Sequence, residues 1–177
     1  DWSSDVCSSD LQTSKAWINI LETLGIIFLL HPYSNNVLKR TIKTPKVYFY
    51  DTGLVCYLTR WTTPEVLRNG AAAGHVFETF VVSEVLKSYM NAGADVRDVW
   101  FYRDSRKREI DLVIQEGRVL HPVEIKKGVQ VGADAIRSFP CLEGMQGYEV
   151  GFGHVICQTD RPYPISQKVQ AVPVWAI

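Results

Sequence analysis

Near the start of the chain, apolar residues recur three and four positions apart, which is the spacing of an amphipathic helix. This stripe runs over residues 13–24, and Gly25 follows it as a typical helix end. Apolar runs at residues 26–30 and 47–50 then enclose a polar, basic stretch, which predicts two strands joined by a long loop. Helix, strand, basic loop and strand form the second half of a winged helix, so we expect a partial winged-helix segment over residues 12–60.

A joint of small residues at positions 70–74 separates this segment from the rest of the chain. Before the joint, Asp51 can cap a short helix, and Thr63 followed by Pro64 can open another. We take residues 61–73 as the linker between two units. The joint lacks the Gly-Lys-Ser/Thr ending of a phosphate-binding P-loop, and no other such loop occurs, so an ATP site is absent from these residues.

After the joint, the pattern changes to one long helix followed by short strands. A broad apolar face predicts a helix over residues 76–90. Strands are predicted at residues 99–103, 109–115, 119–126, 153–158 and 169–176, with a second helix at residues 133–139. The order predicts an α/β fold over residues 74–177, in which helices on both sides of a mixed sheet cover its central strands.

Residues 1–11 (DWSSDVCSSDL) match the translation of a sequencing adapter, so we exclude them from the fold as a non-native scar. They carry Asp1, Asp5 and Asp10 and no basic residue, and without them 16 acidic residues face 19 basic ones, a net charge of +3. A mildly basic chain is compatible with a nucleic-acid partner. We also expect natural sequence to be missing before Gln12.

The composition of the 177 residues excludes disordered, collagen-like and disulfide-stapled proteins, since 46% are hydrophobic and 21% are charged. No apolar run approaches the roughly 18 to 20 residues that a membrane span needs, so no membrane association is expected. Outside the scar, Cys56, Cys141 and Cys157 are too widely spaced for a zinc motif. An odd number of thiols without a signal peptide indicates a reducing cytoplasm.

Carboxylates and a lysine gather in the predicted strands. Glu124 and Lys126 are two positions apart in one strand and therefore share a face of the sheet. Asp111 lies in the preceding strand, and a turn at Glu116-Gly117 would place it one diagonal step from Glu124. Glu78, in the predicted helix, could reach the same patch if that helix packs over it.

This grouping predicts a cation site. Like-charged carboxylates repel each other in a poorly hydrated site, and burial raises their pKa values further. Mg²⁺ relieves both effects and takes one or two protein carboxylates together with substrate phosphates. We therefore expect Asp111 and Glu124 to hold Mg²⁺ and Lys126 to orient a water for phosphodiester hydrolysis. The alternative is that Glu124 and Lys126 form a solvated ion pair on an open sheet face.

Two basic clusters are candidates for contact with a phosphate backbone. The first lies in the long loop of the front segment, and the second lies in the turn between two predicted strands. The candidate nucleic-acid-binding residues are Lys39, Arg40, Lys43 and Lys46 in the first cluster, and Arg106, Lys107 and Arg108 in the second. The alternative for both is that an exposed loop carries solvated charge.

Several stretches resemble known families. FYRDSRKREIDLVIQ (101–115) and HPVEIKKG (121–128) are similar to the PD-(D/E)xK nuclease superfamily, although Ile110 stands where that superfamily has a proline. TPKVYFYDTGLVCYL (44–58), GHVFETFVVSEVLKSY (74–89) and the closing AVPVWAI resemble the domain of unknown function DUF4143.

The resemblance implies a restriction-endonuclease-like fold behind a winged helix, with an AAA-type ATPase domain upstream that this chain lacks. By position, Asp111 and Glu124 match the metal ligands, Ile125 the residue whose carbonyl joins them, Lys126 the catalytic lysine and Glu78 the helical acid. Two functions fit. The first is a Mg²⁺-dependent DNA endonuclease driven or regulated by the ATPase. The second is a non-catalytic module that binds DNA or packs against the ATPase or a partner.

Overall fold

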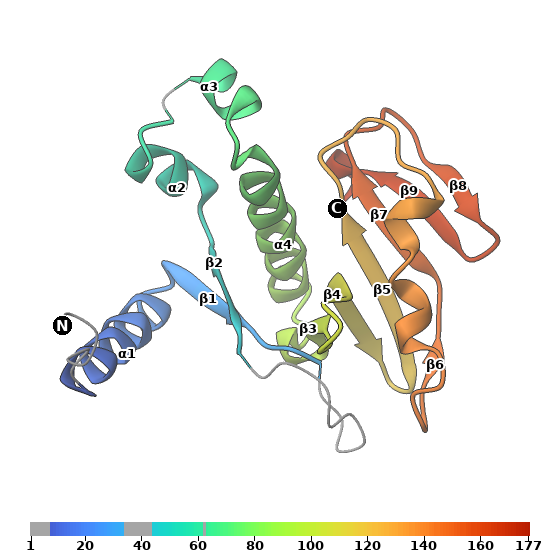
Figure 1. Ribbon diagram of the computed structural model, residues 1–177, viewed down its shortest axis with the longest axis horizontal. Coiled ribbons are helices and arrows are strands. Elements are labelled where there is room, and N and C mark those ends of the chain that lie inside the picture. Colours follow the sequence, from blue (N-terminus) through green and yellow to red (C-terminus); the bar gives the residue numbers. More distant parts are fainter. Residues whose placement is uncertain (1–7, 34–43, 62) are drawn as a thin grey trace.

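A mixed sheet with one long helix packed on it forms the body of the molecule (Figure 1). The structure, a computed structural model, describes residues 8–33, 44–61 and 63–177. Helix α4 (Ala73–Asn91) packs on one face of the sheet, as the apolar pattern predicted. In the described residues, no helix is both long and apolar enough to cross a membrane.

The front segment begins with a helix and a two-stranded ribbon. Helix α1 (Ser8–Thr23) projects from the body (Figure 1) and ends before Gly25, whose φ of 68° confirms the predicted helix stop. Strands β1 (Ile27–Leu30) and β2 (Lys46–Phe49) pair antiparallel, which confirms the predicted pair of strands. A bridge between Pro32 and Phe101 attaches the ribbon to the sheet.

Two short helices follow, and both start at the caps that the sequence indicated. The Asp51 carboxylate accepts backbone hydrogen bonds at the start of α2 (Thr52–Leu58), and the Thr63 hydroxyl does so at the start of α3 (Pro64–Asn69). Helix α3 therefore occupies much of the stretch 61–73 that we expected to be a linker.

The seven-stranded sheet has the order β3-β4-β5-β7-β9-β8, with β6 paired to β5. Its strands are β3 (Val99–Arg103), β4 (Glu109–Glu116), β5 (Val119–Ile125), β6 (Glu149–Val150), β7 (Gly153–Cys157), β8 (Tyr163–Ser166) and β9 (Val169–Pro173). Strands β3, β4 and β5 form an antiparallel meander, whereas β5, β7 and β9 run parallel. The predicted mixed α/β sheet is confirmed, but the short strands β6 and β8 were not predicted.

Each face of the sheet has its own apolar core. On one face, Val81 and Val85 of α4 pack with Leu112 and Val123 and with Phe28 of the ribbon. On the other face, the core includes Ile110, Val113, Leu120, Phe139 and Leu142. Both faces of the central strands are therefore covered, so any polar side chain that points from them is withdrawn from bulk water.

The helix predicted at residues 133–139 is wrong, because the chain forms two separate 3₁₀ turns there. These are η2 (Ala133–Ile136) and η3 (Phe139–Leu142). Pro140 lacks the N–H that a continuous helix would need in its interior, so the helical pattern breaks. The last strand also ends earlier than predicted, and a 3₁₀ turn, η4 (Val174–Ala176), follows Pro173.

The register of the β4–β5 hairpin differs from the expected one. Glu116 lies opposite Val119, so the turn is formed by Gly117 and Arg118, and Gly117 adopts a φ of 61°. This register continues to Leu112 opposite Val123. The paired register ends there, and the backbone N–H of Ile125 donates a hydrogen bond to the Asp111 carboxylate, which holds Asp111 beside the end of β5.

A bulge in β4 sets the direction of Asp111. Trp100 of β3 lies opposite Val113, but Tyr102 lies opposite Ile110, so β4 has one extra residue between these pairs. At the bulge, two residues of β4, Asp111 and Leu112, lie opposite the single residue Phe101 of β3. In agreement, Ile110 packs in one core and Leu112 in the other. In a regular strand, residues two positions apart would share a face.

Gly151, which joins β6 to β7, is required by close packing. A Cβ there would lie 2.5 Å from Cε1 of His121 and 2.6 Å from Cγ1 of Val119. We therefore expect Gly151→Ala to lower the free energy of unfolding by about 1–3 kcal/mol, measured by urea denaturation. The control is Gly74→Ala in α4, where no atom lies within 4 Å of the new Cβ and alanine should stabilise the helix. Equal effects of the two substitutions would contradict this account.

Candidate active site

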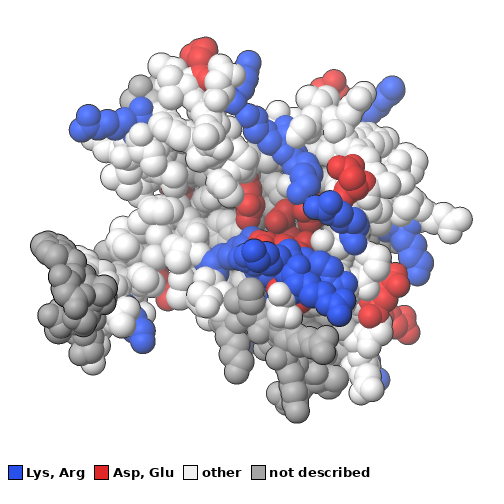
Figure 2. Space-filling view, viewed as in Figure 1, with Lys and Arg blue, Asp and Glu red and all other residues white. Residues whose placement is uncertain are grey.

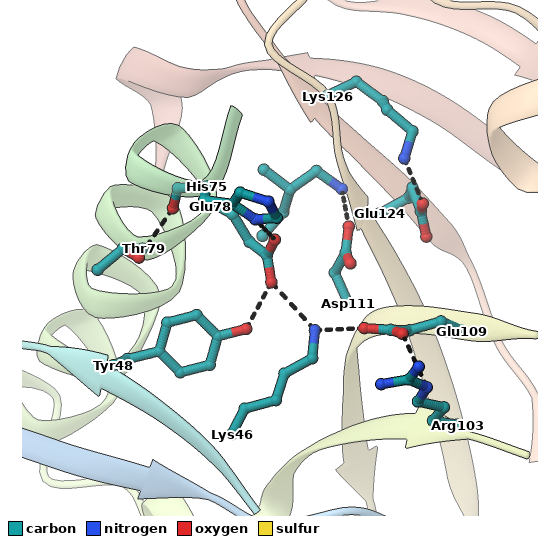
Figure 3. A network of polar contacts seen from close by, with 11 residues as sticks. Lys46, Tyr48, His75, Glu78, Thr79, Arg103, Glu109, Asp111, Glu124 and Lys126 are labelled. Atoms are coloured by element: carbon teal, nitrogen blue, oxygen red, sulfur yellow. Dashed lines mark hydrogen bonds and ion pairs between the residues drawn. The ribbon is translucent and has the colours of Figure 1, made fainter. Parts of the chain in front are cut away.

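One part of the site is a cluster of charged residues between α4 and β2. The Glu78 Oε1 atom of α4 accepts a hydrogen bond from the Tyr48 hydroxyl at 2.5 Å and from Lys46 Nζ at 3.1 Å. Lys46 Nζ also lies 2.5 Å from Oε1 of Glu109, which in turn pairs with Arg103 at 3.4 Å. Figure 3 shows the Lys46 ammonium between the two carboxylates. Glu78 is therefore paired with Lys46 and Tyr48 and points toward β2.

Asp111 lies at the centre of the acidic residues. Its side chain is about nine-tenths buried, and its Oδ2 atom accepts a hydrogen bond from the backbone N–H of Ile125 at 2.8 Å. Burial, followed by repulsion from the charges of Glu124 and Glu78, raises the pKa of Asp111 to about 7. At neutral pH the metal-free site therefore holds this carboxyl partly protonated.

Glu124 and Lys126 form the other part of the site. Lys126 Nζ lies 2.6 Å from Oε1 of Glu124, which is 8% exposed. The second oxygen, Glu124 Oε2, is buried and has no hydrogen-bond partner in the part of the chain that the structure describes. Burial raises the pKa of Glu124 against the opposing effect of Lys126. Burial lowers the pKa of Lys126, but the hydrogen bond and charge of Glu124 outweigh it, so the net pKa is raised and Lys126 is a cation.

Basic side chains surround these acids on the surface. Figure 2 shows Lys and Arg side chains on both sides of a hollow in which acidic side chains lie. The next residue after Lys126 is Lys127, whose Nζ donates a hydrogen bond to the carbonyl of Arg68 and so ties α3 to the end of β5. The distribution of charge is that of a buried anionic centre with a cationic margin.

The structure brings three of the predicted catalytic residues together and turns the fourth away. Asp111, Glu124 and Lys126 meet where β4 begins and β5 ends. Glu78 acts electrostatically on Asp111, but its own hydrogen bonds go to Lys46 and Tyr48.

The candidate nucleic-acid-binding residues have different surroundings. Lys46 lies inside the charged cluster with only 23% of its side chain exposed, and Arg108 is held by Asp104 at 2.7 Å. Arg106 and Lys107 are exposed at the turn between β3 and β4. Lys39, Arg40 and Lys43 lie outside the described residues.

Lys46, Tyr48 and Glu109 are members of the site that the sequence reasoning did not place there. The signal for the first two was the alternation Lys46-x-Tyr48, which puts both side chains on one face of β2. That the face meets α4 was not readable from the sequence, because nothing in the pattern fixes how the ribbon docks on the second unit.

The carboxylates of the site fit a divalent cation. Two adjacent carboxylates and one buried, unpartnered carboxylate oxygen fit Mg²⁺, which needs few protein ligands when phosphate and water complete its shell. The described residues contain no group of three or more His, Cys, Asp or Glu arranged to hold a metal. Of the carboxylates that the structure describes, Asp111 and Glu124 are the two that would bind the cation.

Comparison with protein families finds two matches. A family described as a domain of unknown function (DUF4143) matches residues 73–177, and a second, also described as a domain of unknown function (DUF8612), matches residues 4–65. Curated proteins and solved structures give no match to the chain.

Proposed function

This chain belongs to the DUF4143 family of domains of unknown function, and from its geometry we propose that it hydrolyses phosphodiester bonds of nucleic acid with a divalent cation at Asp111 and Glu124. The proposal includes a PD-(D/E)xK nuclease-like arrangement of the sheet and a partial winged helix in front of it. DNA is the proposed substrate, and an AAA-type ATPase domain is the proposed upstream partner.

The observation that carries the proposal is the unpartnered oxygen of Glu124. A buried polar atom without a hydrogen bond costs about 1–3 kcal/mol, and more if it is charged. Glu124 Oε2 has this cost beside Asp111, a second carboxyl whose pKa is raised to about 7. A purely structural ion pair would not need either feature, whereas a bound cation would coordinate the free oxygen and favour the charged form of both carboxyls.

Each residue has a separate role in this mechanism. A bound divalent cation supplies charge stabilisation for the phosphate and acidifies the attacking water. The Ile125 N–H holds Oδ2 of Asp111, so Oδ1 is the atom that would bind the cation. Lys126 is a protonated ammonium next to Glu124, so it orients water and offsets negative charge on the phosphate rather than removing a proton. Ile125 would add its backbone carbonyl to the ligands.

We expect Glu124→Gln to abolish binding of Mg²⁺ to the full chain, because the amide removes the charge and adds a donor that repels the cation. Isothermal titration calorimetry with Mg²⁺ measures the loss, and cleavage of duplex and branched DNA gives a second readout. The control is Glu143→Gln, at an exposed position outside the site. Undiminished Mg²⁺ binding by Glu124→Gln, or no binding by the unaltered chain, would refute the proposal.

A non-catalytic docking module is the second candidate, because lysines already engage most of the acids. Lys46 pairs with Glu78 and Glu109, and Lys126 pairs with Glu124. Exposed apolar side chains on α2, Tyr57 at 75% and Leu58 at 60%, would then contact the ATPase domain or another partner. Intact folding with neither Mg²⁺ binding nor cleavage would favour this candidate.

A further inference from the structure

A polar cavity of about 270 Å³ opens on the face of the sheet that carries η2. Three cations and three acids line it, and they are Lys107, Lys126, Arg137, Glu109, Glu124 and Asp134. The volume corresponds to about nine water molecules, so a hydrated phosphate group fits inside. Glu124 and Lys126 thus face a space that a phosphate can enter.

Lys107 is held at this cavity by an unusual backbone conformation. Its φ is 62°, in the left-handed region where glycine is the usual residue of a hairpin loop. Asp104 builds the turn, since its carboxylate accepts hydrogen bonds from the N–H groups of Arg106 at 2.9 Å and Arg108 at 3.0 Å. A lysine at such a position costs conformational free energy, and strained positions of this kind cluster at functional sites.

Arg137 also lines the cavity, and it directly follows the 3₁₀ turn η2. Lys126 pairs with Glu124, and Glu109 pairs with Lys46 and Arg103. Over residues 44–61 and 63–177, by contrast, neither Lys107 nor Arg137 forms an ion pair within the chain. Their charged groups are therefore available to an outside anion.

We propose that Lys107 and Arg137 form a phosphate-binding subsite for a nucleic-acid strand, next to Glu124 and Lys126. The inference rests on the proposed function and adds how the strand is held. Two cations from separate segments, the β3–β4 turn and the end of η2, would bind the phosphate that flanks the reacting one. Arg106 and Arg108 have no such place, because Arg108 is held by Asp104 and Arg106 does not line the cavity.

The test is binding of a fluorescent single-stranded oligonucleotide to the full chain in EDTA, so that neither cation binding nor cleavage enters the result. We expect Lys107→Gly and Arg137→Gln each to weaken binding about 5- to 10-fold and to reduce the slope of log K against log salt by about 0.7. The control is Arg118→Gln, at an exposed position in the turn between β4 and β5 and outside the cavity, which should bind like the unaltered chain.

Glycine is chosen at position 107 so that the substitution does not impair folding. Lys107→Gly should raise the urea midpoint, as should Arg60→Gly at the other described non-glycine residue with positive φ, 60°. Arg60→Gly should leave oligonucleotide binding unchanged. Unaltered binding by both Lys107→Gly and Arg137→Gln would overturn the inference. Inorganic phosphate that competes as strongly as the oligonucleotide would also overturn it, since the subsite would then bind the free ion. If the unaltered chain bound no Mg²⁺ in calorimetry, that result would instead count against the proposed function.

Discussion

Asp111→Asn is expected to remove divalent-cation binding and, at the same time, to make the metal-free protein more stable at pH 8. The folded pKa of Asp111, about 7, lies above the unfolded value, because burial and repulsion from Glu124 and Glu78 disfavour the charged form. Between about pH 4 and pH 7 the unfolded chain therefore binds fewer protons than the folded chain, and stability falls as the pH rises. Asparagine stays neutral throughout and can still accept the hydrogen bond from Ile125.

The difference between the two proteins should grow with pH and reach an upper bound of about 4 kcal/mol above pH 7. Urea denaturation in EDTA at pH 5 and at pH 8 measures it, with exposed Asp98→Asn as the control. Saturating Mg²⁺ should restore stability to the unaltered chain and leave Asp111→Asn unchanged. A gain in stability that is equal at both pH values would show that the charge of Asp111 is not the cause.

Lys126→Met is expected to lower cleavage by about 10²- to 10³-fold, the usual cost of removing one group that stabilises developing charge. Mg²⁺ affinity should be retained or increased, because Glu124 Oε1 loses the ammonium that now lies 2.6 Å away. This separation of cleavage from cation binding distinguishes a role on the phosphate from a role in folding.

The matched control is Lys127→Met, which removes the next lysine along the chain and only its bond to the carbonyl of Arg68. Cleavage assays and calorimetry on both variants, with urea denaturation to verify folding, complete the comparison. Should the two lysine variants cleave equally well, Lys126 would have no special part in the reaction.

The sequence predicted the elements of the second unit better than the arrangement of its charged side chains. The strands β3, β4 and β5 were readable because their apolar runs are short and are bounded by Asp104 and Gly117, residues that favour turns. The 3₁₀ turns could not be read from the sequence, because residues of η2 and η3 have the apolar spacing of a short helix. Only Pro140 departs from that helical pattern.

The site was predicted in composition but not in geometry. Asp111, Glu124 and Lys126 could be grouped from alternation within one hairpin, because sheet faces follow from a period of two. The bulge at Asp111 and the turn at Gly117 each shift side chains by a residue or more, and neither leaves a hydrophobic signature. The ion pairs of Lys46 depend on how two units dock, which only tertiary packing decides.

The contact of Glu78 with Lys46 and Tyr48 crosses the boundary between the two family matches, since Glu78 lies in residues 73–177 and its partners in residues 4–65. A chimera that takes either half from a homologue must therefore have matching residues at these three positions. Otherwise a partly buried charge in one half is left without its partner in the other. Substitutions at these three positions are energetically coupled and should be inherited together.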